Sequence, residues 1–150
     1  MNCAMLSALR KRAEIPGNKA VFMEESVRMD AHVQVRKIYQ LLSEVQTLSM
    51  QLAEAIDRND EVAIQMVLAM REEPLRALQR VQNSLRRQLE AMEPADAKAL
   101  RSLLNGEPAG VPEEEPIAQQ VAANARLLQR VRELDSVLNR KITHEQSIYS

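Results

Sequence analysis

The residues of this chain that could carry chemistry are two histidines, one cysteine and several neighbouring carboxylates. His32 and His144 lie far apart, and neither has a Glu or Cys at the spacing of a metal site. Cys3 has no context that would activate a thiolate. There is no Gly-rich phosphate loop and no G-x-S-x-G elbow. We therefore expect no enzyme activity, no cofactor and no metal, and we interpret the adjacent acids as solvated (Glu24-Glu25, Glu72-Glu73 and Glu113–Glu115).

Basic residues gather in two short stretches that could contact nucleic acid, one with Arg80, Arg86 and Arg87 and one with Arg126, Arg130 and Arg132. Aromatic residues make up only 2% of the chain, so no stacking platform for single strands is present. The net charge is −1, which gives no overall attraction to a polyanion. The sequence therefore predicts no nucleic-acid partner.

A single cysteine excludes an intramolecular disulfide and favours a reducing compartment, the cytoplasm. No apolar run approaches the ~20 residues of a membrane span, so we expect no stable membrane insertion. The start has an apolar patch before its basic residues, the reverse of a signal peptide. We interpret residues 1–22 as a disordered N-terminal extension and 23–150 as one domain. The alternative for the extension is an organelle-targeting or membrane-surface helix.

Apolar residues at alternating spacings of three and four predict a long helix from about Glu24 to Arg58, followed by a second to about Met92. Asn59 is expected to cap the second helix. Within it, Pro74 cannot donate to the carbonyl of Met70, which predicts a kink or a break. Glu72 and Arg76, four residues apart, are expected to pair across it.

Glu93-Pro94 and Asn105-Gly106 are the start and stop signals of a short helix. A loop over 106–116 with three prolines and four glutamates follows, and then a helix over 117–142. Short connections make neighbouring helices antiparallel. The predicted fold is all-α, an elongated antiparallel bundle with a long coiled-coil hairpin.

The last helix places two polar residues, Asn124 and Asp135, inside an apolar arc of roughly 140°. One account is that Asn124 fixes register, as a polar residue in a helix seam does. The other is that both line a groove filled by the helix of a partner. For the groove, the edge with Leu127 and Leu134 is expected to form the wall while Leu128 packs internally. The candidate client-binding residues are Asn124, Leu127, Val131, Leu134, Asp135 and Leu138.

The order of elements, with the stretch N-A-R-L-L (124–128) in the last helix, resembles the FlgN-type flagellar export chaperones and the related FliT-type proteins. That family commonly carries N-x-x-N-x-x-L-L in its last helix. Asn124, Leu127 and Leu128 match the second half of this pattern, while Val121 stands where its first Asn would be. The resemblance covers the layout of roughly residues 24–145. It implies a cytoplasmic chaperone for flagellar type III export, without ATPase activity, that holds C-terminal segments of hook–filament junction proteins by helix-in-groove binding.

Three alternatives stay open from the sequence. The chain could be a structural coiled-coil or adaptor protein that forms a homodimer through the same apolar face and has no secreted client. It could be a regulatory or enzymatic bundle whose site is assembled from distant positions. The stretch MREEPL (70–75) could also contact a client rather than merely bend its helix.

Overall fold

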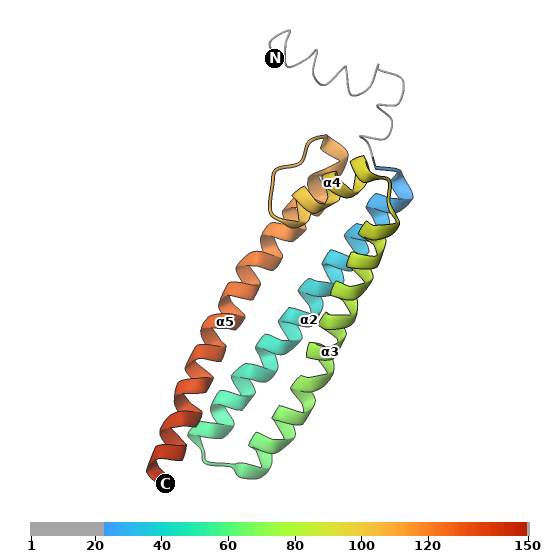
Figure 1. Cartoon of the computed structure of the whole chain (residues 1–150). Coiled ribbons are helices and arrows are strands. Elements are labelled where there is room, and N and C mark those ends of the chain that lie inside the picture. The colour runs from blue at the N-terminus through green and yellow to red at the C-terminus, as the bar shows by residue number, and fades with distance from the viewer. Residues whose placement is uncertain (1–22, 150) are drawn as a thin grey trace, which may run out of the picture.

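The computed structural model describes residues 23–149, and this part of the chain is helical and contains no β-strand (Figure 1). The all-α prediction is therefore confirmed. The predicted N-terminal extension, residues 1–22, lies outside the described residues. In chain order the elements are α2 (Glu25–Asp57), α3 (Glu61–Ala91), α4 (Pro94–Leu104), the 3-10 helix η2 (Pro112–Glu114) and α5 (Glu115–Tyr149).

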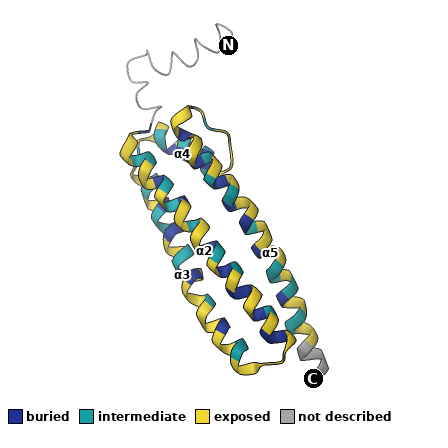
Figure 2. Ribbon diagram, turned by 180° about the vertical axis from the view of Figure 1, so that it is seen from behind, coloured by how far each residue is buried: buried dark blue, intermediate teal, exposed yellow. Residues whose placement is uncertain are grey.

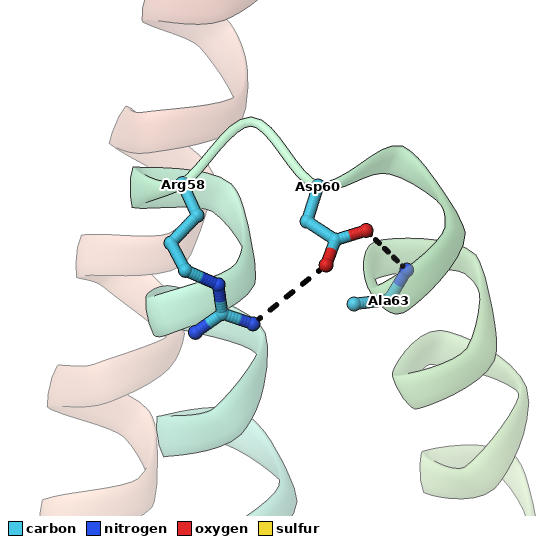
Figure 3. Close-up of polar contacts among 3 residues, drawn as sticks. All are labelled: Arg58, Asp60 and Ala63. Carbon is cyan, nitrogen blue, oxygen red and sulfur yellow. Dashed lines mark hydrogen bonds and ion pairs between the residues drawn. The ribbon is translucent and has the colours of Figure 1, made fainter.

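The turn between α2 and α3 is closed by caps on both helices. Asn59 adopts a left-handed backbone, with φ 54°, and its amide donates to the carbonyl of Ile56 over 3.0 Å. The amide of Asp60 donates to the carbonyl of Ala55, also over 3.0 Å, which completes a Schellman motif. Asp60 then caps α3, because its Oδ1 accepts from the amide of Ala63 over 3.1 Å (Figure 3). The prediction that Asn59 caps α3 is wrong, since Asn59 ends α2 instead.

Helix α3 continues through Pro74 without interruption, so the predicted break does not occur. The ring of Pro74 is almost fully buried in the bundle. The predicted pair is present: the Arg76 guanidinium lies 2.8 Å from the Glu72 carboxylate. Both partners are largely exposed, so this pair adds little stability.

The short helix α4 ends in a second Schellman motif at Gly106, whose φ is 93°. The amide of Gly106 donates to Leu103 and that of Glu107 to Ser102, each over 3.0 Å. In the loop that follows, Glu114 is only 3% exposed and accepts from the amide of Gly110 over 2.8 Å. The prediction that all three glutamates of this run are solvated is thus wrong for Glu114, which ties the loop to the start of α5.

Helix α2 lies between α3 and α5 and packs along both (Figure 1). The backbones of α3 and α5 approach each other far less closely. Buried residues fall into three clusters along the bundle (Figure 2). One cluster joins α2, α4 and α5 at the α4 end, around Leu100, Leu103 and Ile117. The next joins α2 and α5 around Leu42 and Leu127, and the last joins α2, α3 and α5 near the α2–α3 turn.

Two properties of the described region bear on function. No helix among residues 23–149 combines the length and apolar character needed to cross a membrane. Within residues 23–144, whose side chains the structure describes, no three residues of His, Cys, Asp or Glu are grouped so that they could hold a metal ion.

Candidate protein-binding surface

The apolar face of α5, which the sequence proposes as a client site, is part of the core. Leu127, Val131 and Leu138 are 1%, 5% and 3% exposed. Leu127 and Val131 pack against Leu42 and Val45 of α2. The expectation that Leu127 forms the wall of an open groove is therefore wrong. The physical reason is that α2 covers this edge of α5 along its length.

The two edges of the apolar face of α5 differ less in burial than the sequence predicts. Leu128 is half-buried and packs against the cluster that contains Leu127, and Leu78 of α3 packs against the same cluster. Leu134, expected beside Leu127 in the groove wall, is also half-buried. Neither edge of the face is fully exposed, and the Leu127 edge belongs to the core.

Asn124 is buried, and its hydrogen bonds are made within the chain. Its Nδ2 donates to the carbonyl of Val35 in α2 over 2.8 Å. Its Oδ1 accepts from Nε2 of Gln120, one turn earlier in α5, over 3.2 Å. A buried polar side chain that is satisfied only in one alignment of two helices penalises every other alignment. This geometry supports the register account of Asn124.

Asp135 joins α5 to α3 through an ion pair. Its Oδ1 lies 3.1 Å from a terminal nitrogen of Arg71, whose side chain is only 14% exposed. The Nε of Arg71 is buried without a hydrogen-bond partner. Of the six candidate client-binding residues, three are therefore in the core, Asn124 and Asp135 bond to other parts of the chain, and Leu134 is partly covered.

The structure instead exposes apolar side chains on the first half of α3. Val62 is 74% exposed, Met66 58%, Met70 49%, Leu75 45% and Leu68 39%. These five residues, with the exposed Ala69, are called the α3 tip surface below; at 100° per residue, Val62, Met66 and Met70 lie along one flank of the helix and Leu68 and Leu75 along the other. They lie on the half of α3 that follows the α2–α3 turn, at the edge of the bundle (Figure 2).

The local sequence explains why this surface cannot be hidden within one chain. The nine residues VAIQMVLAM (62–70) contain one polar residue, Gln65. A helix this apolar presents apolar side chains on all sides, and only part of its circumference can face α2 and α5. Val67 is buried, while Ala63 and Ile64 are partly buried. The remaining apolar residues of the stretch are left to solvent. Helices that are apolar all round are normally buried, so this stretch has the character of an interface.

Sequence reasoning missed this surface although the signal was available. A search for one heptad stripe assigns Ile64, Val67 and Leu68 to the core and leaves Val62, Met66 and Met70 unexamined. Counting polar residues in 62–70 would have found the stretch. The two exposed methionines also fit an interface, because a flexible, polarisable thioether adapts to different partners.

Comparison of the chain with protein-family models, with curated proteins and with solved structures finds no match.

Proposed function

We propose that this protein is a client-binding helical chaperone of the FlgN type, and that its α3 tip surface takes the client. The proposed clients are C-terminal helical segments of hook–filament junction proteins, held in the cytoplasm before export. The family part of this proposal rests on the resemblance in layout and on the N-A-R-L-L stretch. The placement of the client rests on the structure.

The observation that carries the proposal is the exposure of the α3 tip surface. The exposed portions of Val62, Met66 and Met70, which lie along one flank of α3, together amount to nearly two whole side chains. Full burial of one such side chain contributes about 1.5–3 kcal/mol, so covering this ridge contributes about 3–5 kcal/mol from this chain, and the apolar residues of the client add to it. Association costs at least about 4 kcal/mol of this. A client would therefore bind reversibly through these residues, as a chaperone that must release its cargo requires.

The shape of the surface supports a helical client. Val62, Met66 and Met70 recur every four residues, so they form one ridge along α3. The small side chain of Ala69 beside the ridge allows a second helix to approach closely. An amphipathic helix with apolar residues at i, i+3, i+4 and i+7 is the partner that packs on such a ridge.

We infer further that α2 and α3 form the elongated coiled-coil hairpin expected from the sequence. Helix α2 packs along α3, and its buried residues Val35, Leu42, Ser49 and Ile56 recur every seven residues as in a coiled coil, although Val35 and Leu42 of this series contact α5. Small-angle X-ray scattering would test it, since a rod of about 50 Å, set by 33 residues at 1.5 Å each, scatters differently from a sphere of equal mass.

The client proposal is tested by co-expression with C-terminal segments of hook–filament junction proteins from the source organism. We expect the wild-type chain to retain such a segment through affinity purification and gel filtration, and Met66→Glu to lose it. Met29→Glu is the matched control, because Met29 is 60% exposed and lies in α2 near the α4 end of the bundle. Retention by Met66→Glu, or equal loss in both variants, would refute the tip surface as the client site.

A further inference from the structure

We propose that the side of the α2–α5 pair that faces away from α3 binds an acidic amphipathic segment of another protein. This side is called the basic flank below, and it carries three arginines around one tyrosine (Arg36, Tyr39, Arg126 and Arg130). It lies on helices other than α3, so this second partner binds independently of the client proposed above.

The contacts of α2 place Arg36 and Tyr39 on the basic flank. Val35 faces α5, because its carbonyl accepts a hydrogen bond from that helix over 2.8 Å. Gln34, one residue earlier, faces α3, where its Nε2 donates to Oγ of Ser84 over 3.3 Å. Successive helical residues are about 100° apart, so Arg36 lies on the opposite side of Val35 from Gln34. Tyr39 lies about 40° beyond Val35 in the same direction as Arg36.

The contacts of α5 place Arg126 and Arg130 on the same side of the bundle. Asp135 faces α3, where it pairs with Arg71, and Leu127 packs against α2. Around the helix axis, Arg130 and Arg126 lie about 60° and 100° beyond Leu127, in the direction away from Asp135. Both arginines are exposed. They therefore border the α2–α5 contact on the side that α3 does not occupy.

The alignment of the two helices brings these residues to one level of the bundle. Helices α2 and α5 lie side by side and run in the same direction (Figure 1). Val35 lies beside Asn124, so Tyr39, one turn later, lies between the levels of Arg126 and Arg130. The charged groups and the ring are thus separated by only about one helical turn, roughly 5.4 Å, along the bundle axis.

The three arginines of the basic flank have no acidic partner in the part of the chain that the structure describes. None of them makes an ion pair or a side-chain hydrogen bond within residues 23–144. On α3, by contrast, Arg76 and Arg80 are each paired with an acid of the same helix, Glu72 and Glu73. The basic flank therefore presents uncompensated positive charge, which is complementary to carboxylates.

Apolar groups beside the arginines favour a protein segment as the source of these carboxylates. Tyr39 is 37% exposed, and Leu134, one turn after Arg130, is half-buried. An amphipathic helix with acids along one edge of its apolar face can cover the apolar groups and pair with the arginines. Nucleic acid fits less well, because the net charge is −1 and one ring provides no path of stacked bases.

Fluorescence anisotropy with two labelled peptides tests the charge complementarity. The first peptide is an amphipathic helix of leucines and glutamates in heptad order, and the second has glutamine in place of every glutamate. We expect the full-length chain to bind the glutamate peptide at least about threefold more tightly, and the difference to shrink as salt is added. Equal affinities for the two peptides would overturn the proposal.

Paired substitutions test the location. Arg126→Gln with Arg130→Gln should weaken binding of the glutamate peptide several-fold. The matched control, Arg76→Gln with Arg80→Gln, removes the same charge from α3 and should bind as the wild type does. All four positions are exposed, so both double variants should keep their helices, which circular dichroism checks.

Two results would overturn the location, namely unchanged binding by the α5 double variant or an equal loss in the α3 control. A labelled single-stranded oligonucleotide, titrated in the same way, tests the class of partner. Tighter binding of the oligonucleotide than of the glutamate peptide would overturn the assignment to an acidic protein segment. None of these measurements uses the client of the α3 tip surface, so failure here is distinguishable from failure of the proposed function.

Discussion

The buried Asn124 offers a direct test of how α5 is held in register on α2. Replacing it with Ala removes the hydrogen bond to the Val35 carbonyl and leaves Nε2 of Gln120 without its acceptor. The Val35 carbonyl keeps the helical bond from the amide four residues later, so only one strong interaction is lost outright. Replacing Asn124 with Leu removes the same bonds but fills the space with apolar atoms.

The magnitude follows from the burial of the group. The partners keep other hydrogen-bonding options, because the Val35 carbonyl retains its helical bond and Gln120 is only partly buried, so the net loss is about 0.5–1.5 kcal/mol. For a chain of this length, each kcal/mol lowers the melting temperature by about 2–4 °C. We therefore expect Asn124→Ala to melt about 1–6 °C below the wild type. Asn124→Leu should be close to the wild type or more stable, because the surrounding residues Val35, Val121 and Leu127 are apolar.

The assay is urea unfolding followed by circular dichroism, with gel filtration of the folded variants. If Asn124 specifies register, Asn124→Leu should keep its stability yet show a broader transition or mixed species, since other helix alignments are no longer penalised. An Asn124→Ala variant as stable as the wild type would refute the assigned hydrogen bond. An Asn124→Leu variant less stable than Asn124→Ala would refute the apolar surroundings.

Three further predictions concern stability. Leu127→Ala should lower the free energy of unfolding by about 2–5 kcal/mol, and Leu134→Ala by clearly less, because Leu127 is 1% exposed and Leu134 is half-buried. Urea titrations of both variants measure the two losses, and a larger loss for Leu134→Ala would contradict this prediction. Burial, and secondarily the nearby Glu24 and Glu93, raise the pKa of Asp96, so its ionised form destabilises the fold as pH rises through that pKa. Asp96→Asn should therefore raise the melting temperature at neutral pH, and the gain should vanish below about pH 3.9, where the unfolded chain is also protonated; a gain that persists in acid would contradict this. Pro74→Ala should stabilise α3 by about 1 kcal/mol, because a proline inside a helix costs about 3 kcal/mol and the two lost ring carbons return less than that; a lower melting temperature would show that ring packing dominates.

The helices and most of their ends could be predicted because their signals are local. A heptad stripe defines α2, and Gly106 stops α4 where only a positive φ continues the chain. At the first turn, Asn59 and Asp60 are both good caps, and the sequence alone does not say which of them ends α2 and which begins α3. The structure resolves this by giving the left-handed position to Asn59.

The candidate site could not be predicted in the same way because it depends on which neighbours cover a face. The apolar arc of α5 is visible in the sequence, but its two edges look alike until α2 is placed against Leu127. The α3 tip surface is the reverse case, an apolar face that no neighbouring helix covers. Its apolar excess is visible in the sequence, but exposure of Val62 and Met66 follows only once α3 lies at the edge of the bundle.

The turn at residues 58–60 also sets how this chain can change over evolution. Arg58 and Asn59 cap the C-terminus of α2, and Asp60 caps the N-terminus of α3, so every residue of the turn is part of a cap (Figure 3). One inserted residue would rotate α3 by about 100° about its axis, because an α-helix has 3.6 residues per turn. That rotation would carry Met66 towards the core and Val67 towards solvent. Among related chains we therefore expect insertions and deletions in the loop that leads to η2 and not at this turn. A constant turn length preserves the exposed face of α3.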